Sequence, residues 1–289
     1  MDTPTRYSHC RRRTVAPPER SRSMRVLSYN TLFGGLDGID DRRYQAQIEI
    51  IQSLSPDILL LQEAKSFTAD GAKRLYETER RLTMRGFVAE APATGQHTAI
   101  FARPEFRPMA FIPDSQHFHH ATATLKVALP GEDRALTVVS VHLCPNSPHV
   151  RAREASYLYN LADPEELTLI GGDFNSVAPD DPEPDDLALL PARYRMRYTR
   201  EDGTADRTTI AGLLRAGFVD VGNSLEATPT PTVPARGFTN TEFMTFRSDY
   251  LFASKRLADC AVGYAVASND ATDVASDHYP IWADFALGP

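Results

Sequence analysis

From Met24 onward, short runs of β-branched and aliphatic residues alternate with longer stretches in which apolar residues recur every three or four positions. A run of four to eight apolar residues bounded by polar or turn residues predicts a buried strand. The predicted strands cover residues 25–29, 58–62, 98–102, 124–128, 136–141, 168–171, 250–253 and 281–285.

The longer stretches predict helices over residues 42–54, 71–84, 149–161 and 208–216. In the first of them Tyr44, Ile48 and Ile51 fall on one helical stripe, and Gly217 ends the last at the usual C-terminal position for glycine. Many strands with a few interspersed helices predict an α/β layered fold, in which sheets pack on each other and helices lie outside.

The first 23 residues are rich in Arg, Pro and Ser and lack hydrophobic periodicity, so we expect a disordered tail there. The run Arg11, Arg12, Arg13 is better explained as part of a solvated tail than as a nucleic-acid-binding arm. Structured sequence begins at Met24, which is also a candidate for the true start, and residues 24–289 are expected to form one domain.

The net charge of −7 conceals an asymmetry between the tail and the domain. Residues 1–25 carry seven Arg against Asp2 and Glu19, a net of +5, so the remainder carries −12. Proteins that hold long duplex nucleic acid by counterion release usually present a basic face, so the acidic domain argues against non-specific DNA binding.

Other features of the sequence limit the cellular location of the protein and the kinds of site that it can form. No apolar run approaches the roughly 18 residues of a membrane span, and no apolar stretch follows the N-terminal arginines to act as a signal-peptide core. We expect a cytoplasmic protein and a monomer. The three cysteines have no C-x-x-C spacing, which suggests neither a disulfide framework nor a cysteine zinc site.

Several apolar runs end in polar residues of the types that enzymes use. A buried strand holds its terminal residue rigidly, so several such ends at one edge of a sheet can converge on a pocket. Any one of them has the simpler explanation of a turn former or helix cap. The candidates are Asn30, Glu63, His142, Asp173, Asn175, Asp249, Asp277 and His278.

Three of these segments carry more information than a single polar residue. Glu63 follows four aliphatic residues and Gln62, and a nearly buried carboxylate needs a cation. Asp173 and Asn175 follow two glycines that allow a sharp backbone turn, and their period-two spacing aims both the same way with Phe174 turned into the core. This spacing pairs a carboxylate able to orient water with an amide able to donate to a phosphate oxygen.

The third informative segment is the pair Asp277 and His278. The following Tyr279 and Pro280 indicate a loop entering the last strand, where both side chains can face one pocket. Asp277 can then bind a metal, and His278 can act on the reacting group if another residue orients its second ring nitrogen. Asp249 is the natural candidate for that role.

The segments SYN, LLQE, SVHL, GGDFNS, RSDYLF and SDHYPIWADF occur in this order. Together they resemble the ordered motifs of the endonuclease/exonuclease/phosphatase superfamily, which includes DNase I-like nucleases, abasic-site endonucleases, sphingomyelinases and inositol polyphosphate phosphatases. The resemblance spans residues 24–287, and GDFN and SDH are its most specific parts. It implies a DNase I-like four-layer α/β sandwich, with two packed mixed β-sheets flanked by helices.

The resemblance also implies a metal site for Mg²⁺ or Mn²⁺. Carried over position by position, Glu63 would be the principal metal ligand, supported by Asp277 and by Asn30 nearby. An oxygen-rich site of this kind suits a hard cation, which helps to neutralise an anionic phosphoester during attack by water.

The same resemblance implies roles for the remaining candidates. Asp173 would position the attacking water, and Asn175 would contact the phosphate. His278, oriented by Asp249, and His142 would serve proton transfer and stabilisation of charge in the transition state.

The function implied is that of a divalent-metal-dependent phosphoester hydrolase, with a phosphodiesterase or nuclease as the leading hypothesis. The partner is a phosphoester substrate, with nucleic acid among the candidates. Two alternatives stay open: a phosphatase or phosphodiesterase for a small-molecule or lipid phosphoester, and a catalytically inert binding module on the same fold. The subtype is mixed, because residues 62–65 resemble abasic-site endonucleases whereas His142 stands where those enzymes usually have tyrosine.

Two further segments have simple explanations. The stretch 180–186 (DDPEPDD) is predicted to be a solvated loop near the rim of the site; if it overhangs the cleft, it would favour small substrates. The cluster His117, His119 and His120 lacks cysteine partners and helical spacing, so we expect a loop with solvent-exposed imidazoles rather than a zinc site.

Overall fold

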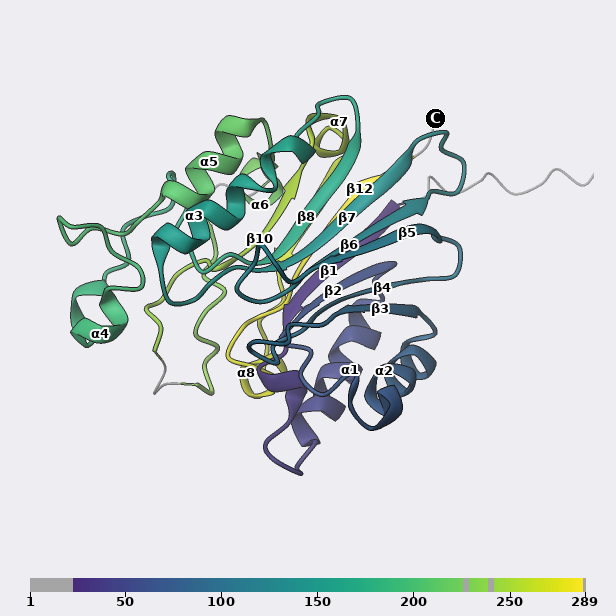
Figure 1. Cartoon of the computed structure of the whole chain (residues 1–289), viewed down its shortest axis with the longest axis horizontal. Helices are drawn as coiled ribbons and strands as arrows, with labels where there is room; N and C mark the ends of the chain where they lie inside the picture. The colour runs from purple at the N-terminus through teal and green to yellow at the C-terminus, as the bar shows by residue number, and fades with distance from the viewer. Residues whose placement is uncertain (1–22, 226–228, 239–241, 288–289) are drawn as a thin grey trace, which may run out of the picture.

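The computed structural model describes residues 23–225, 229–238 and 242–287. Two mixed six-stranded sheets pack face to face. Helices α1 (Arg42–Leu54) and α2 (Ala69–Leu82) lie outside one sheet, and α3 (Pro148–Ser156) and α5 (Thr208–Ala216) lie outside the other (Figure 1). These four layers confirm the predicted four-layer α/β sandwich.

The first sheet contains β1 (Ser23–Asn30), β2 (Ile58–Gln62), β3 (Arg85–Ala89), β4 (Thr98–Ala102), β11 (Ala261–Val266) and β12 (Ile281–Ala286). Their order across the sheet is β11–β12–β1–β2–β4–β3. β1 runs parallel to β2, and the other neighbouring strands are antiparallel.

The second sheet contains β5 (Arg107–Asp114), β6 (Thr122–Ala128), β7 (Ala135–His142), β8 (Leu167–Asp173), β9 (Val219–Asp220) and β10 (Asp249–Ala253). Their order is β5–β6–β7–β8–β10–β9. Here β7 and β8 are the parallel pair, and the other neighbours are antiparallel.

All eight predicted strands are present, and they are the eight inner strands of the two sheets. The strands that the sequence did not predict, β3, β5, β9 and β11, form the four edges. Edge strands bury fewer side chains and so lack a continuous apolar run. β5 is mostly exposed and contains Pro108 and Pro113, which a sheet tolerates at its edge.

The helix predictions are correct for α1 and α5 and need correction for the other two. α2 begins and ends two residues earlier than predicted, because Thr83 takes a left-handed conformation (φ 54°) that ends the helix. α3 stops at Ser156, and Tyr159–Leu161 forms a separate 3₁₀ turn. Short helices also occupy the connections: α4 (Ala192–Arg195), α6 (Val221–Leu225), α7 (Lys255–Ala258) and α8 (Thr272–Ala275).

The predicted tail lies almost entirely in residues 1–22, which are outside the described residues. Ser23 already belongs to β1, where it pairs with Ala286. Among the described residues, no helix is both long enough and apolar enough to cross a membrane.

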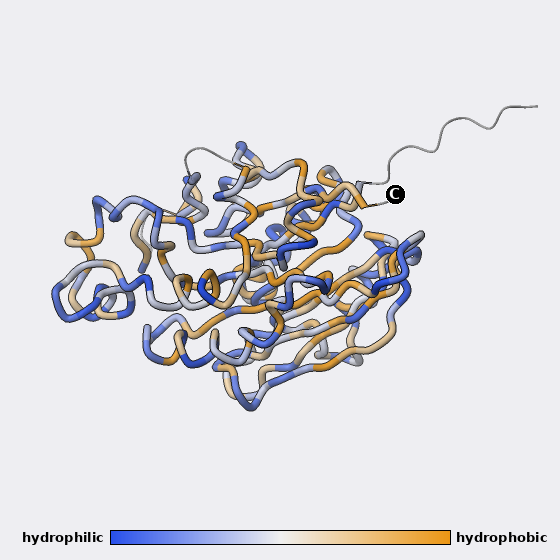
Figure 2. The backbone as a smooth tube through the Cα atoms, turned by 90° about the horizontal axis from the view of Figure 1, so that it is seen from above, coloured by the Kyte–Doolittle hydropathy of each residue, from blue (hydrophilic) through white to orange (hydrophobic). Residues whose placement is uncertain are grey.

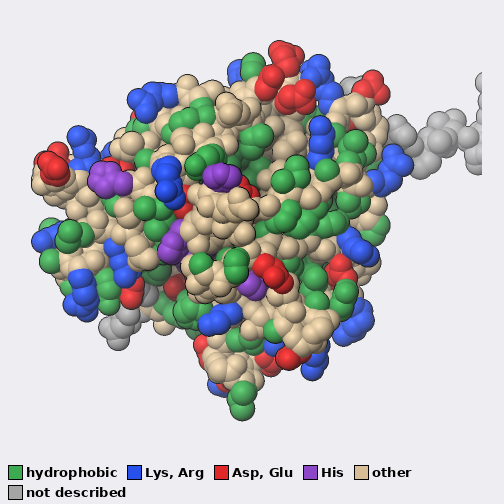
Figure 3. Space-filling model, viewed as in Figure 1, with side chains coloured by type: hydrophobic (Ala, Val, Ile, Leu, Met, Phe, Trp, Pro, Cys, Tyr) green, Lys and Arg blue, Asp and Glu red, His purple; other side chains and the backbone are tan. Residues whose placement is uncertain are grey.

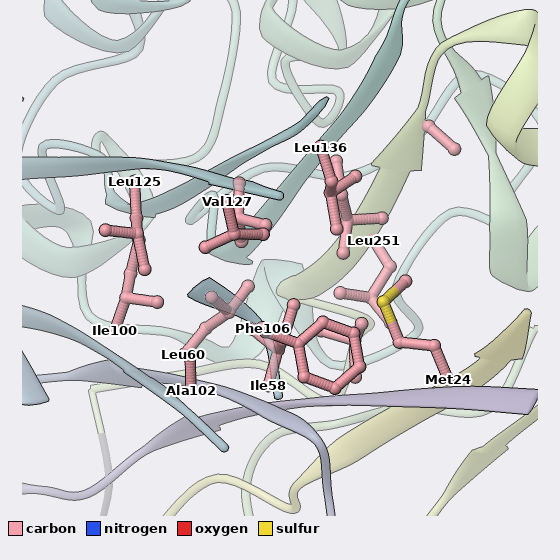
Figure 4. Close-up of a cluster of buried hydrophobic side chains, with 14 of the residues drawn as sticks. Met24, Ile58, Leu60, Ile100, Ala102, Phe106, Leu125, Val127, Leu136 and Leu251 are labelled. Atoms are coloured by element: carbon pink, nitrogen blue, oxygen red, sulfur yellow. The ribbon is translucent and has the colours of Figure 1, made fainter. Parts of the chain in front are cut away.

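The main hydrophobic core lies between the two sheets. Ile58 and Leu60 of the first sheet point toward Val127, Leu136 and Leu251 of the second (Figure 4). Apolar segments run through the middle of the molecule and polar segments along its outside (Figure 2). Because a fully buried aliphatic side chain contributes about 1.5–3 kcal/mol, this layer is the main source of stability.

Two further cores fasten the helices to the outer faces of the sheets. The predicted stripe Tyr44, Ile48 and Ile51 on α1 packs against the outer face of the first sheet, where Leu59 and Leu61 lie. On the second sheet, α3 and α5 pack over residues of β7, β8 and β10.

A buried polar link crosses the sandwich beside these cores. Gln62 of β2 donates from Nε2 to Ser140 Oγ of β7 at 3.1 Å, and Ser28 Oγ of β1 donates to Gln62 Oε1 at 3.4 Å. All three side chains are buried. Since a buried polar group without a partner is costly, this link favours one register between the two sheets.

The two glycines before Asp173 are required for a different reason than the sharp turn expected from the sequence. Both lie within β8, and the strand continues to Asp173. A Cβ on Gly171 would lie 2.6 Å from Leu60 Cδ1 of the facing sheet, so this glycine permits close sheet packing. Gly172 has φ 147°, and a Cβ there would lie 1.9 Å from the Val141 carbonyl oxygen.

Arg247, two residues before β10, is buried and pairs with two buried carboxylates. Its guanidinium donates to both oxygens of Asp181 at 2.8 and 3.0 Å, and it lies 2.7 Å from Asp220 Oδ2. The three side chains tie the loop after β8 and the edge strand β9 to the start of β10. This ion cluster therefore fixes the segment that also carries Asp249.

We predict that Gly172→Ala destabilises the fold by about 3 kcal/mol or more, because the added methyl meets the Val141 carbonyl and the backbone conformation disfavours it. Gly131→Ala is the matched control, since Gly131 also has positive φ (83°) but open space around its Cβ position. The control should lose only about 1–2 kcal/mol. Urea unfolding of both variants measures the difference, and equal losses would contradict the assigned clash.

We predict that Arg247→Leu costs about 3–5 kcal/mol at pH 7, because Asp181 and Asp220 stay buried without their cation. Burial already raises the pKa of Asp220. Arg247 opposes that rise, so its removal raises the folded-state pKa of Asp220 further. The folded variant then binds more protons than its unfolded form as the pH falls, and its deficit should shrink between pH 7 and 5. Arg256→Leu, at an exposed ion pair, should change stability by less than about 0.5 kcal/mol.

Candidate active site

The structure gathers the predicted site residues at one edge of the sandwich. Six of the eight line a single pocket of about 400 Å³. These six are Glu63, His142, Asp173, Asn175, Asp277 and His278. Asn30 and Asp249 lie directly behind this wall and contact it through hydrogen bonds.

The directions of the strands explain this convergence. β1, β2, β7 and β8 end at this edge, which places Asn30, Glu63, His142 and Asp173 there. β10 runs antiparallel to β8, and β12 runs antiparallel to β1. Their first residues therefore lie at the same edge, which brings in Asp249 and the loop before β12.

Asp173 accepts more hydrogen bonds than the other acids of the site. Its Oδ1 accepts hydrogen bonds from Ser248 Oγ at 2.7 Å and from the Asn175 backbone N–H at 2.9 Å. Its Oδ2 accepts one from Asn30 Nδ2 at 3.1 Å. Because these donors come from different segments, the carboxylate is held in one orientation.

Two imidazoles approach the same carboxylate. Oδ2 of Asp173 lies 3.4 Å from His142 Nε2 and 3.6 Å from His278 Nε2. Burial alone would raise the pKa of Asp173, but His278 and His142 outweigh burial and lower that pKa. Asp173 is therefore an ionised carboxylate in a nearly closed environment, able to accept a hydrogen bond or a proton from a bound water.

His278 is held from behind by Asp249. Its Nδ1 lies 2.8 Å from Asp249 Oδ2, which also accepts a hydrogen bond from Thr232 Oγ1 at 2.6 Å. Burial would lower the pKa of His278, but Asp249 and Asp173 reverse this and raise it well above its ordinary value. The ring is thus a buried imidazolium with Nε2 turned toward Asp173, as the orienting role of Asp249 requires.

Glu63 follows β2 directly and has φ 56°, an uncommon backbone conformation for a residue other than glycine. Its Oε2 accepts the backbone N–H of Phe33 at 2.9 Å. Its Oε1 accepts Asn30 Nδ2 at 3.4 Å. The side chain is half-buried at the pocket wall, so its carboxylate is positioned and still accessible to a ligand.

Glu63, Asp173 and Asp277 bring three carboxylates to one pocket. Burial raises the pKa of Asp277, and the nearby Glu63 and Asp173 add to that rise. The cost of holding these negative charges together falls if a cation binds between them. Their oxygen atoms are the ligands that Mg²⁺ and Mn²⁺ accept.

A second arrangement of ligand atoms is present deeper in the site. One ligand atom each from Asp173, Asp249 and His278 lies within 4.8 Å of the others. A metal there would displace the short hydrogen bond between Asp249 and His278 and would meet an imidazolium. The side of the pocket formed by Glu63 and Asp277 therefore fits a cation better.

The two asparagines differ in how they reach the site. Asn30 donates to Asp173 and Glu63, and its Oδ1 accepts the Leu32 backbone N–H at 3.1 Å, so its observed contacts position the two acids. Asn175 faces the pocket because it takes a left-handed conformation (φ 49°) after the strand has ended. The predicted period-two spacing is therefore not the reason that Asp173 and Asn175 share a face.

Residues that the sequence did not single out complete the site. Ser248 holds Asp173, and Thr232 holds Asp249 and accepts the backbone N–H groups of Ser248 and Asp249. The adjacency of Ser248 to Asp249 was a usable signal. Thr232 lies in a loop whose sequence gives none.

The histidine cluster is only partly as expected. His117 and His119 are exposed, but His120 is 5% exposed and lines the pocket, which corrects the prediction of a solvent-exposed loop. Its ring stacks on His142 with centroids 4.2 Å apart and planes 27° apart. Burial of a histidine in a loop depends on tertiary contacts that the local sequence does not reveal.

The acidic loop at 180–186 differs from a simple solvated segment. Asp181 is buried against Arg247, Asp186 accepts hydrogen bonds from Thr245, and Glu183 pairs with Arg207. The loop lines a separate pocket of about 420 Å³. Two of its five acids, Asp181 and Glu183, are therefore paired with arginines within the protein.

The mouth of the active-site pocket mixes aromatic and charged side chains. Phe33 is 42% exposed there, and Phe243 packs edge-on against His278 with ring centres 5.6 Å apart. Arg197 and Glu242 form an ion pair at the same rim. On the face seen in Figure 3, several histidines come to the surface among arginine and acidic side chains.

Solved structures share this architecture. The chain is 20% identical to an AP endonuclease from Archaeoglobus fulgidus, with a TM-score of 0.68 over 91% of this chain and 100% of that one. It is 17% identical to D. rerio TDP2 complexed with single strand DNA product (TM-score 0.64; 92% and 99% covered). It is also 17% identical to a functionally unknown conserved protein from Enterococcus faecalis V583 (TM-score 0.65; 91% and 100% covered). At these identities the likeness establishes the fold.

A comparison with curated protein sequences gave no match. The profile of the Endonuclease/Exonuclease/phosphatase family matches residues 27–278, which includes every predicted site residue. With this match over most of its length, and with the fold and the ordered motifs described above, the chain belongs to the endonuclease/exonuclease/phosphatase family.

Proposed function

We propose that this protein is a divalent-metal-dependent phosphodiesterase that hydrolyses its substrate by direct attack of water. The observation that carries the proposal is the position of Asp173. This buried, ionised carboxylate lies between two imidazoles, across one pocket from Glu63 and Asp277. Such a pocket combines a water-positioning acid with cationic and hydrogen-bonding groups for a phosphate.

Glu63 and Asp277 would hold the metal, with Asn30 close by. Burial raises the pKa of Asp277, and Glu63 and Asp173 raise it further, so a bound cation would offset the cost of ionising these neighbouring acids. When bound, Mg²⁺ or Mn²⁺ would act as a Lewis acid that withdraws charge from the phosphate oxygens.

The residues of the chain supply the remaining chemistry. Asp173 takes a proton from the water as the water oxygen bonds to phosphorus, the bond from phosphorus to the leaving oxygen breaks, and a histidine, His278 or His142, donates a proton to that oxygen. Asn175 contacts a non-bridging oxygen. His278, kept as an imidazolium by Asp249, and His142 serve proton transfer and stabilise the charge that develops on the phosphate.

The substrate class rests on two observations. The folds of an AP endonuclease and of TDP2 bound to a single strand DNA product are similar to this one, which favours a phosphodiester in nucleic acid. The acidic loop at 180–186 gives little support for a small substrate, because Asp181, Glu183 and Asp186 are already paired inside the protein.

Hydrolysis assays test the function directly. The protein should release p-nitrophenol from bis(p-nitrophenyl) phosphate in Mg²⁺ faster than from p-nitrophenyl phosphate, and EDTA should stop the reaction. Preference for the monoester would indicate a phosphatase, and no turnover of either would favour an inert binding module. Supercoiled DNA, abasic duplex, single-stranded DNA and RNA tested side by side then define the natural diester.

We predict that Glu63→Gln weakens Mg²⁺ binding at least tenfold and lowers kcat/KM about a hundredfold or more, because one anionic ligand is lost. The fold should remain, since Gln keeps an oxygen to accept the Phe33 N–H. Titration calorimetry measures the metal affinity. Glu165→Gln, an exposed acid, is the control, and unchanged Mg²⁺ binding in Glu63→Gln would remove Glu63 from the ligand set.

We predict that Asp249→Ala and His278→Ala each lower kcat/KM by about 10²–10⁴, the range for loss of a positioned proton-transfer group. The double variant should lose little more than the worse single, because Asp249 acts through the ring of His278. The measurement is kcat/KM for the four members of the cycle at saturating Mg²⁺. Additive losses would show that the two residues act independently.

A further inference from the structure

His120 occupies a position in the pocket to which the proposed chemistry assigns no role. Its ring is stacked on His142, whose Nε2 in turn faces Asp173 at 3.4 Å. It lines the same pocket as the three acids. The ring of His142 thus lies between His120 and Asp173, the group proposed to position the attacking water.

A buried acid holds the loop that carries this ring. Glu154 of α3 is fully buried, and its carboxylate accepts the backbone N–H of His119 at 2.5 Å and that of Cys144 at 2.8 Å. Cys144 lies just after β7, which ends at His142. Glu154 therefore ties the loop of His120 to the strand end that carries His142, and so maintains the stack.

The contact at Nδ1 shows how Thr94 can select the tautomer of His120. Nδ1 lies 2.8 Å from Thr94 Oγ1, and this oxygen already accepts the Gln96 backbone N–H at 3.3 Å. The Thr94 hydroxyl hydrogen is free to point at Nδ1, and when it does so Nδ1 is the acceptor. In a neutral ring that arrangement places the proton on Nε2.

The ring is neutral under ordinary conditions. Burial, and the neighbouring rings of His142 and His119, lower the pKa of His120 to about 2. In contrast to the imidazolium of His278, His120 thus offers a hydrogen-bond donor without a charge.

Within the described part of the chain, the Nε2 of His120 meets no hydrogen-bond partner, although it is buried. The Oη of Tyr198, which lines the same pocket, is also buried without a partner there. Most buried polar groups are paired, and an unpaired one at the wall of a pocket indicates a group that the ligand satisfies.

We propose that His120 is a substrate-binding residue, whose Nε2–H donates a hydrogen bond to an oxygen of the bound phosphoester. Thr94 sets its tautomer, and Glu154 is a positioning residue that keeps its ring against His142. This inference rests on the proposed phosphodiesterase function and adds to it a neutral donor on the side of the pocket next to His142.

The test compares hydrolysis of bis(p-nitrophenyl) phosphate by the full chain and its variants in Mg²⁺. His120→Phe keeps a ring for the stack and removes the donor, so kcat/KM should fall about ten- to a hundredfold. His120→Gln, which retains a donor, should recover part of that loss. His117→Gln is the matched control, because it changes an exposed histidine in the same loop and should stay within twofold of the wild type.

Thr94→Val gives a second measurement that is independent of the stack. Without the hydroxyl, the Nε2–H tautomer loses its support, and kcat/KM should fall severalfold. If His120→Phe folds and keeps kcat/KM within twofold of the wild type, as His117→Gln does, the proposal is wrong.

A binding measurement separates this proposal from the proposed function. Side-chain ¹⁵N–¹H spectra of histidine should show His120 as the Nε2–H tautomer, with its signal moving when dimethyl phosphate, an unreactive diester, is added with Mg²⁺. An unmoved signal, or the Nδ1–H tautomer, overturns the role of His120 whatever the activity. If the wild type hydrolyses no diester but the signal moves, the hydrolase function fails and the binding role stands.

Discussion

The rest of the structure depends on the contact between the two sheets, because each sheet supplies half of the candidate active site. Glu63, Asn30 and the loop before β12 belong to the first sheet, whereas Asp173 and His142 belong to the second. Apolar side chains press the sheets together, and the Gln62–Ser140 hydrogen bond favours one register. A shift of one sheet against the other would separate the acids before it exposed the core.

Charge balance is the second constraint on the site. Several acids are gathered at one site, where Asp173, Asp249 and Asp277 are buried, and an isolated buried charge is costly. On one side of the site, the imidazolium of His278 lies between Asp249 and Asp173 and offsets this cost. On the other side, Glu63 and Asp277 have no such internal cation among the described residues, which is why the proposed metal belongs there.

The site also concentrates unusual backbone and unpaired polar groups. Glu63 and Asn175 both have positive φ, and His120 and Tyr198 each keep a buried polar atom without a partner in the described part of the chain. Each feature costs stability, of the order of 1–3 kcal/mol. Their presence together around one pocket is typical of a binding site.

The sequence by itself determined the inner strands and the layered class, because buried strands need continuous apolar runs, and the polar ends of those runs supplied the candidate site residues. Tertiary structure alone decided the edge strands, whose half-exposed residues carry no such pattern. It also decided that His120 is buried and that Thr232 supports Asp249, and that Gly171 makes room for Leu60. These features depend on residues far apart in the chain, and contacts of that kind leave no mark on the local sequence.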